Sequence, residues 1–130
     1  MKYDHSKPTS QMLGRFQPWH RGHTELFKRM HAETGQVAIM IRDMPIDDDN
    51  PLLYAEVMEN ILEALEEEGF TKAEDYVIMV VPNITNIGYG RDVGYSITQY
   101  DLGEEIHKIS ATEIRNASKH RTNDITESSD

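Results

Sequence analysis

The residues best suited to chemistry lie in one short passage, residues 14–23, which reads Gly-Arg-Phe-Gln-Pro-Trp-His-Arg-Gly-His. His20 and His23 are three positions apart and are followed by helix-compatible residues, so both imidazoles are expected on one side of a helical first turn. The first amides of a helix lack acceptors within the helix and carry the positive end of its dipole, which favours anions. Two imidazoles beside such amides can donate hydrogen bonds to a polyphosphate and to the charge that develops during its transfer.

Two glycines accompany the histidines in this passage. Gly22 lies between them, where a side chain would obstruct the approach of a phosphate to the backbone, and Gly14 lets the chain turn off a preceding strand beneath a nucleotide. Other roles stay open, because a histidine at a helix start can cap or pack, and a glycine can simply form a turn. A zinc site is disfavoured, since it needs a third protein ligand and no residue is spaced to supply one.

The elements that must position this passage alternate along the chain. Two apolar runs, at residues 37–41 and 76–81, indicate strands buried on both faces, and Asn50 followed by Pro51 is typical of a helix start. Such alternation predicts right-handed crossovers in a parallel sheet. The fold class is therefore α/β, a single Rossmann-like doubly wound parallel sheet with helices on both faces. The remaining predicted elements are strands at 11–13, 95–102 and 106–109, and helices at 20–34 and from 110 onward.

Length and composition set the class of protein. The 130 residues suit one domain, predicted over residues 1–120 with 1–10 as a loose lead-in, followed by a disordered polar tail at 121–130. A net charge of −10 argues against nucleic-acid binding, and no apolar run approaches the roughly 18 residues that cross a bilayer. The absence of cysteine excludes a disulfide framework and a thiol nucleophile. We expect a cytoplasmic protein that binds neither nucleic acid nor membrane.

Polar residues follow two of the predicted strands. Arg42 comes after 37–41, Asn83 comes after 76–81, and Arg91 lies further along. In open α/β sheets, ligands bind at the carboxyl ends of the strands, so these three are candidates to bind a second, acceptor substrate. A surface arginine paired with its neighbouring aspartate is an equal alternative for Arg42.

Two passages resemble signatures of the nucleotidyltransferase (cytidylyltransferase-like) superfamily. His20-Arg21-Gly22-His23 resembles its His-x-Gly-His motif, and the preceding Gly14-Arg15-Phe16-Gln17-Pro18 is similar to the version in archaeal-type nicotinamide mononucleotide adenylyltransferases. Residues 109–115, Ile-Ser-Ala-Thr-Glu-Ile-Arg, resemble the superfamily's Ile-Ser-x-Thr-x-x-Arg. The resemblance covers roughly residues 12–120 and implies that both signatures meet at one edge of the sheet.

The resemblance implies an enzyme that transfers a nucleotidyl group from a nucleoside triphosphate to a small phosphorylated acceptor and releases pyrophosphate. It implies Mg²⁺ held mainly by substrate and water, with no metal ligand from the protein, and it admits a homo-oligomer. Arg42 is the nearest candidate for the basic residue that orients the acceptor. Ala111 departs from the Ser, Thr or Gly often found there, so the resemblance implies contacts from the backbone at that position. The implied catalytic residues are His20, His23 and Arg115, and the implied nucleotide- or phosphate-binding residues are Gly14, Arg15, Phe16, Gln17, Gly22, Ser110, Ala111 and Thr112.

The sequence leaves the substrates open. The Gly-Arg-Phe-Gln-Pro passage leans to ATP, whereas the short separation of Asn86 from Ser110 looks more like alcohol-phosphate cytidylyltransferases, such as those for glycerol phosphate. Phe16 and Trp19 could stack on a base or shield the site. A non-catalytic nucleotide-binding module is the alternative of another class. A metal-dependent phosphohydrolase is disfavoured, because the acidic run at 47–49 lies on a predicted loop.

Overall fold

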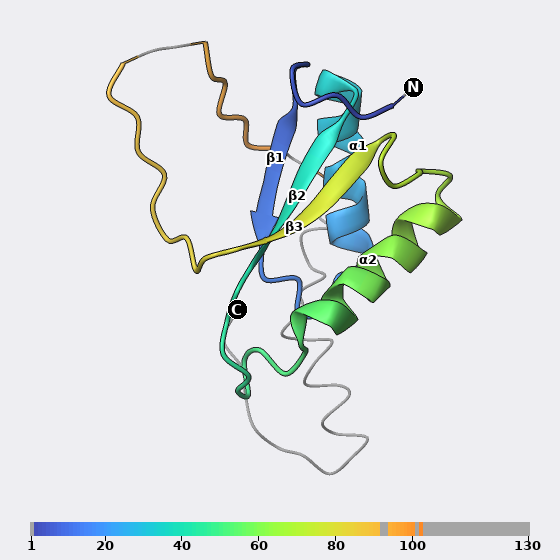
Figure 1. The fold of residues 1–130 in the computed structure, drawn as a ribbon, viewed down its shortest axis with the longest axis vertical. Coiled ribbons are helices and arrows are strands. Elements are labelled where there is room, and N and C mark those ends of the chain that lie inside the picture. Colours follow the sequence, from blue (N-terminus) through green and yellow to red (C-terminus); the bar gives the residue numbers. More distant parts are fainter. Residues whose placement is uncertain (1, 92–93, 101, 103–130) are drawn as a thin grey trace.

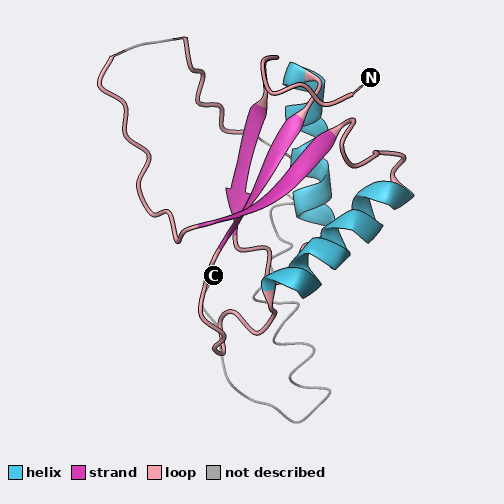
Figure 2. Ribbon diagram, viewed as in Figure 1, coloured by secondary structure: helices cyan, strands magenta, loops and turns pink. Residues whose placement is uncertain are grey.

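In the part of the chain that the structure describes, the regular elements are three strands and two connecting helices (Figures 1 and 2). The computed structural model describes residues 2–91, 94–100 and 102. The order of element types over these residues is the one predicted, and it gives an α/β, Rossmann-like arrangement. The elements are β1 (Ser10–Gly14), α1 (Arg21–Thr34), β2 (Val37–Arg42), α2 (Tyr54–Glu67) and β3 (Tyr76–Val81).

The strands form a parallel sheet in the order β1-β2-β3. Met12 pairs with Ile39, and Ile39 pairs with Ile78, so the middles of the strands are aligned. Gly14 pairs with Ile41 at the carboxyl end. This register brings the carboxyl ends of the three strands to one edge, from which the loops that follow them continue.

Both helices cover the same face of the sheet (Figure 2), as right-handed crossovers between successive neighbouring strands require. The core lies between this face and the helices. It contains the fully buried Phe27 of α1, whose ring meets Tyr76 of β3 edge-on at 5.7 Å, and Phe70 at 4.9 Å. The helix predicted from residue 110 lies outside the described residues. The other principal core side chains are Met12, Val37, Ile39, Ile41, Val57, Ile61 and Leu65.

The N-terminal lead-in is fastened to the opposite, amino-terminal edge of the sheet. The buried amide of Gln36 donates from Nε2 to the Asp4 carbonyl and to Thr9 Oγ1, both at 2.7 Å. Its Oε1 accepts from the Asp4 amide at 3.1 Å, and the Tyr3 amide donates to the Ala73 carbonyl at 2.9 Å. Residues expected as a loose lead-in therefore carry specific hydrogen bonds to the turns that precede β2 and β3.

The start of α2 differs from the prediction. The helix begins at Tyr54 with Leu53 as its N-cap, rather than at Pro51 with Asn50 as the cap. The reason is tertiary: the side chain of Asn50 is buried and bonded to Asp47 and Arg15, so it is unavailable to cap a helix. A local propensity is overridden by contacts with residues distant in the sequence.

The segment after β3 also differs from the prediction. Residues 95–100 and 102 form no strand, so the strand predicted at 95–102 is wrong for the described positions. Its alternating residues include Tyr95 and Ile97, whose side chains are about three-quarters exposed (74% and 76%). The strand predicted at 106–109 and the tail at 121–130 lie outside the described residues. Within the part of the chain that the structure describes, neither helix has the length and apolarity to span a bilayer.

Candidate active site

The first turn of α1 is capped by the side chain of His20. The backbone of His20 is extended (φ −137°, ψ −178°), and its Nδ1 accepts a hydrogen bond from the Gly22 amide at 3.0 Å. Its carbonyl accepts from the amides of His23 and Thr24 at 2.9 and 3.1 Å. An imidazole thus takes the place of the Ser or Asp oxygen that usually caps a helix. The amides of Gly22 and His23 are engaged in the cap, so the imidazoles rather than these amides are the donors to consider.

His23 completes the cap from the other side. Its Nδ1 accepts from the His20 amide at 3.1 Å, which makes the two histidines reciprocal caps. Their rings are stacked, with centroids 3.9 Å apart and planes at 29°. A nitrogen that accepts a backbone N–H carries no proton, so each neutral ring has its proton on Nε2. The backbone therefore holds both imidazoles as Nε2–H donors, which is the protonation needed to stabilise a polyphosphate oxygen.

Two buried aromatic rings, those of Phe16 and Trp19, pack against the imidazole of His23. Phe16 meets it edge-on at 5.1 Å and Trp19 lies 5.3 Å away. The Trp19 Nε1–H donates to Thr24 Oγ1 at 2.8 Å, which fixes the indole against α1. Phe16 is 3% exposed and Trp19 is 7% exposed. Of the two roles considered for these rings, burial favours shielding the site over stacking on a base.

Gly14 is required by the ring of Phe16. Phe16 has a left-handed backbone (φ 54°), which folds its ring back over the end of β1. A Cβ at Gly14 would lie 2.8 Å from Cε1 and 2.9 Å from Cζ of that ring. The glycine that the sequence suggested as a turn residue beneath a nucleotide therefore also makes room for the aromatic support of His23.

Arg15 and Gln17 both contact the loop between β2 and α2. Arg15 Nη1 donates to Asn50 Oδ1 at 3.3 Å. The Gln17 amide donates from Nε2 to the Leu52 carbonyl at 3.0 Å and accepts at Oε1 from the Leu52 amide at 2.8 Å. Sequence reasoning did not connect this loop with the site, since it assigned Asn50 to a helix cap. The hydrogen bonds of Arg15 and Gln17 to this loop reveal the connection, and no local sequence pattern signals them.

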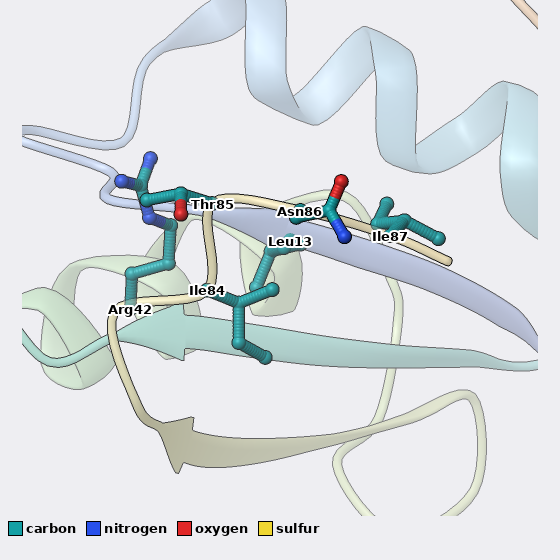
Figure 3. A pocket seen from close by; sticks show the side chains of 6 residues that line it. All are labelled: Leu13, Arg42, Ile84, Thr85, Asn86 and Ile87. Carbon is teal, nitrogen blue, oxygen red and sulfur yellow. The ribbon is translucent and has the colours of Figure 1, made fainter.

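The predicted acceptor residues Arg42 and Asn83 lie together at the end of β2. Arg42 donates to Asn83 Oδ1 from Nε at 3.2 Å and from Nη2 at 2.7 Å. A pocket of about 430 Å³ adjoins them where the segment after β3 passes the ends of β2 and β1 (Figure 3). Arg91 is exposed and does not line this pocket. The pocket is lined by Leu13, Arg42, Ile84, Thr85, Asn86 and Ile87, of which sequence reasoning had nominated Arg42 alone.

The sheet register brings together two arginines, one directly after β1 and the other at the end of β2. Arg15 follows Gly14 and Arg42 follows Ile41, and Gly14 and Ile41 are paired. Because neighbouring strands are about 4.8 Å apart, the backbones at both arginines lie close together at the carboxyl edge. Each guanidinium donates to a neutral amide oxygen, which helps to orient the group. This edge therefore offers two directed cations.

The second signature is not part of the described structure. Ser110, Ala111, Thr112 and Arg115 lie outside the described residues, so their predicted contacts with the triphosphate remain predictions. Among residues 2–91, 94–100 and 102, no group of three or more His, Cys, Asp or Glu side chains could hold a metal ion.

Comparison with known proteins identifies the family. A family model described as cytidylyltransferase-like matches residues 12–97, a stretch that begins within β1 and contains β2, β3, both described helices and the histidine pair. The chain belongs to the cytidylyltransferase-like family. Membership in this family of nucleotidyltransferases agrees with the resemblance found in residues 14–23, and the matched stretch ends before the second signature.

Individual relatives of this cytidylyltransferase-like chain are archaeal. It is 32% identical over 74 residues to the nicotinamide-nucleotide adenylyltransferase of Pyrococcus furiosus and 35% identical over 74 residues to that of Pyrococcus horikoshii. The corresponding protein of Thermococcus sibiricus is 32% identical over 74 residues. Each alignment covers 55% of this chain and 39% of the relative. The similarity is thus partial, and it spans about two fifths of each curated relative.

Proposed function

We propose that this chain is a nucleotidyltransferase that moves a nucleotidyl group from ATP or CTP to a small phosphorylated acceptor and releases pyrophosphate. The observation that carries the proposal is the reciprocal cap of His20 and His23, which leaves Nε2–H as the donor of each ring. Two such donors, stacked at a helix N-terminus, suit a group whose negative charge increases during the reaction. A capping role alone would not require two histidines.

The reaction needs little covalent chemistry from the protein. An oxygen of the acceptor phosphate attacks the α-phosphorus in line, the new P–O bond forms, and the bond to the bridging oxygen of the β-phosphate breaks. The electron pair leaves with pyrophosphate, and no protein nucleophile is needed because the acceptor phosphate is already an anion. His20 and His23 would stabilise the departing charge, with Arg15 and the predicted Arg115 holding phosphates. Arg115 enters this scheme from the sequence resemblance alone.

The acceptor is proposed to bind on the Arg42 side of the edge. Arg42 is oriented by Asn83, and its guanidinium lines the pocket together with polar and apolar side chains such as Thr85 and Ile87. A cation beside a mixed lining suits a phosphate attached to a moderately apolar group. Similarity to nicotinamide-nucleotide adenylyltransferases favours ATP and nicotinamide mononucleotide as the first pair to test.

Magnesium is proposed to arrive with the triphosphate. The described residues offer no three-carboxylate or histidine cluster for a protein-held ion, and Mg²⁺ commonly keeps its waters and binds substrate phosphates. Bound in that way it would neutralise charge on the triphosphate. The imidazoles and arginines of this chain would orient the phosphates.

The test is pyrophosphate release from ATP or CTP with Mg²⁺, across nicotinamide mononucleotide, glycerol 3-phosphate and other phosphorylated acceptors. His23→Ala should lower turnover by roughly 10²–10³, the effect of losing one preorganised donor. His5→Ala changes an exposed histidine of the lead-in and should leave turnover unchanged. Equal activity of the His23→Ala and wild-type proteins would refute the role of His23.

The outcome also separates the alternatives. Turnover with ATP and nicotinamide mononucleotide supports the adenylyltransferase, and turnover with CTP and an alcohol phosphate supports a cytidylyltransferase of the glycerol-phosphate type. Nucleotide binding without pyrophosphate release from any pair would instead indicate a non-catalytic nucleotide-binding module.

A further inference from the structure

The loop between β2 and α2 (residues 43–53) is fastened to the passage that contains the histidines. Both polar atoms of the Gln17 side chain bond to the backbone of one residue, Leu52, at 2.8 and 3.0 Å. Gln17 is 6% exposed, so these bonds are shielded from water. Two bonds to one residue fix both position and direction, much as a neighbouring strand would. The loop therefore has a defined place beside Arg15.

Asn50 is the residue of this loop that faces Arg15, and it is almost completely buried (2% exposed). Its Oδ1 accepts from Arg15 Nη1 at 3.3 Å, and its Nδ2 donates to Asp47 Oδ1 at 3.0 Å. Rotating the amide by half a turn would set a donor against the guanidinium and an acceptor against the carboxylate. The two charged neighbours thus fix the orientation of the amide, and a buried polar group rarely stays unsatisfied.

Asp47 holds Asn50 in place. Its Oδ1 accepts from the Asn50 amide at 2.8 Å and the Asp49 amide at 2.9 Å, in addition to Asn50 Nδ2. Hydrogen bonds from Asn50 lower the pKa of Asp47, with smaller contributions from Asp49 and from the charge of Arg15. The carboxylate therefore remains ionised at neutral pH and keeps its three donors.

We propose that Asn50 is a positioning residue for the phosphate-binding arginine: its amide, held by Asp47, sets the plane of the Arg15 guanidinium at the carboxyl end of β1. The inference rests on the proposed function, because it concerns an arginine of that same site. A guanidinium binds phosphate through two parallel N–H bonds, so its plane determines whether both can form. The amide of Asn50 bonds to both groups and so links the position of Asp47 to that of the Arg15 guanidinium.

The test is calorimetric titration of tripolyphosphate with Mg²⁺ into the full chain. Four proteins form a double-mutant cycle: wild type, Asn50→Ala, Arg15→Ala and the double variant. Asn50→Ala should weaken binding about tenfold in the wild-type background, the scale of one hydrogen bond to a charged group. It should cause no further loss when Arg15 is already alanine, since the effect of Asn50 passes through that side chain. Equal losses in both backgrounds would overturn the inference, because a general structural role does not depend on Arg15.

A second pair of variants covers the case in which Asn50→Ala does not fold. Asp47 is exposed, so its substitutions spare the core. Asp47→Ala removes the acceptor that holds Asn50 and should also weaken binding only when Arg15 is present. Asp47→Asn, the matched control, retains an acceptor oxygen and should keep the affinity within about twofold.

The design separates this inference from the proposed function. If neither Arg15→Ala nor His23→Ala weakens tripolyphosphate binding, the phosphate site itself is wrong and the inference falls with it. If both weaken binding while Asn50→Ala and Asp47→Ala do not, the phosphate site stands and only the positioning role is refuted.

Discussion

Replacing Gly14 by alanine tests the link between the end of β1 and the histidine pair. The new Cβ would lie 2.8 Å from Phe16 Cε1, well inside van der Waals contact. Neither side can yield easily: Gly14 is paired with Ile41 in the sheet, and the Phe16 ring is bounded by Trp19 at 5.0 Å and His23 at 5.1 Å. We expect Gly14→Ala to lower the free energy of unfolding by about 1–3 kcal/mol, as overpacking of a core does.

Displacement of the Phe16 ring should also lower catalytic turnover, because this ring packs against His23. Turnover should fall together with stability, whereas Gly90→Ala, whose Cβ would meet no atom within 4 Å, should change neither. Urea denaturation gives the unfolding free energy, and pyrophosphate release gives turnover. In the double variant Gly14→Ala with Phe16→Leu, the smaller side chain should restore part of the lost stability. A Gly14→Ala protein as stable and as active as Gly90→Ala would refute the argument.

Two further predictions concern stability. Thr24→Val removes the oxygen that accepts from Trp19 Nε1 while keeping the shape, so it should lower the free energy of unfolding by about 1–3 kcal/mol, measured by urea denaturation. Burial, followed by the charges of Glu66 and Asp75, raises the pKa of Tyr76 above its ordinary 10.0. Because the unfolded chain releases this proton first, the associated stability is fully present below pH 10.0 and is lost as the pH rises through the higher folded value. Urea denaturation across that range should show the loss in the wild type and a smaller one in Tyr76→Phe, and identical profiles would contradict it.

Local patterns in the sequence predicted the regular elements well. Continuous apolar runs predicted β2 and β3, and the first helix was confirmed at Arg21–Thr34, where Gly35 ends it with a left-handed backbone (φ 85°). The runs located both strands, but the predicted burial on both faces is wrong for β3, which lies at an edge of the described sheet with Tyr76 buried and Val80 38% exposed. The order of the elements then sufficed for the α/β class.

Features set by distant contacts could not be predicted. Asn50 has the residue type and position of a helix cap, yet its side chain accepts a hydrogen bond from Arg15, 35 positions earlier in the sequence. Residues 95–102 include apolar side chains that suggested a strand, but the described ones among them pair with none of the described strands. In the site, the spacing of His20 and His23 predicted that they lie together. Their Nδ1 hydrogen bonds and the ring contacts of Phe16 and Trp19 with His23 are visible only in the structure. The residues of the second signature remain a sequence prediction.

The fastening of the lead-in by Gln36 has a practical use in labelling experiments. The chain contains no cysteine, so Lys2→Cys would give a single thiol, on a segment held at the amino-terminal edge of the sheet. A fluorophore attached there lies at the far ends of the strands from the histidines and the arginines, where it leaves the ligand site unobstructed. Its signal would report the release of the lead-in from Gln36, and comparison with nucleotide titrations would show whether the two edges of the sheet respond together.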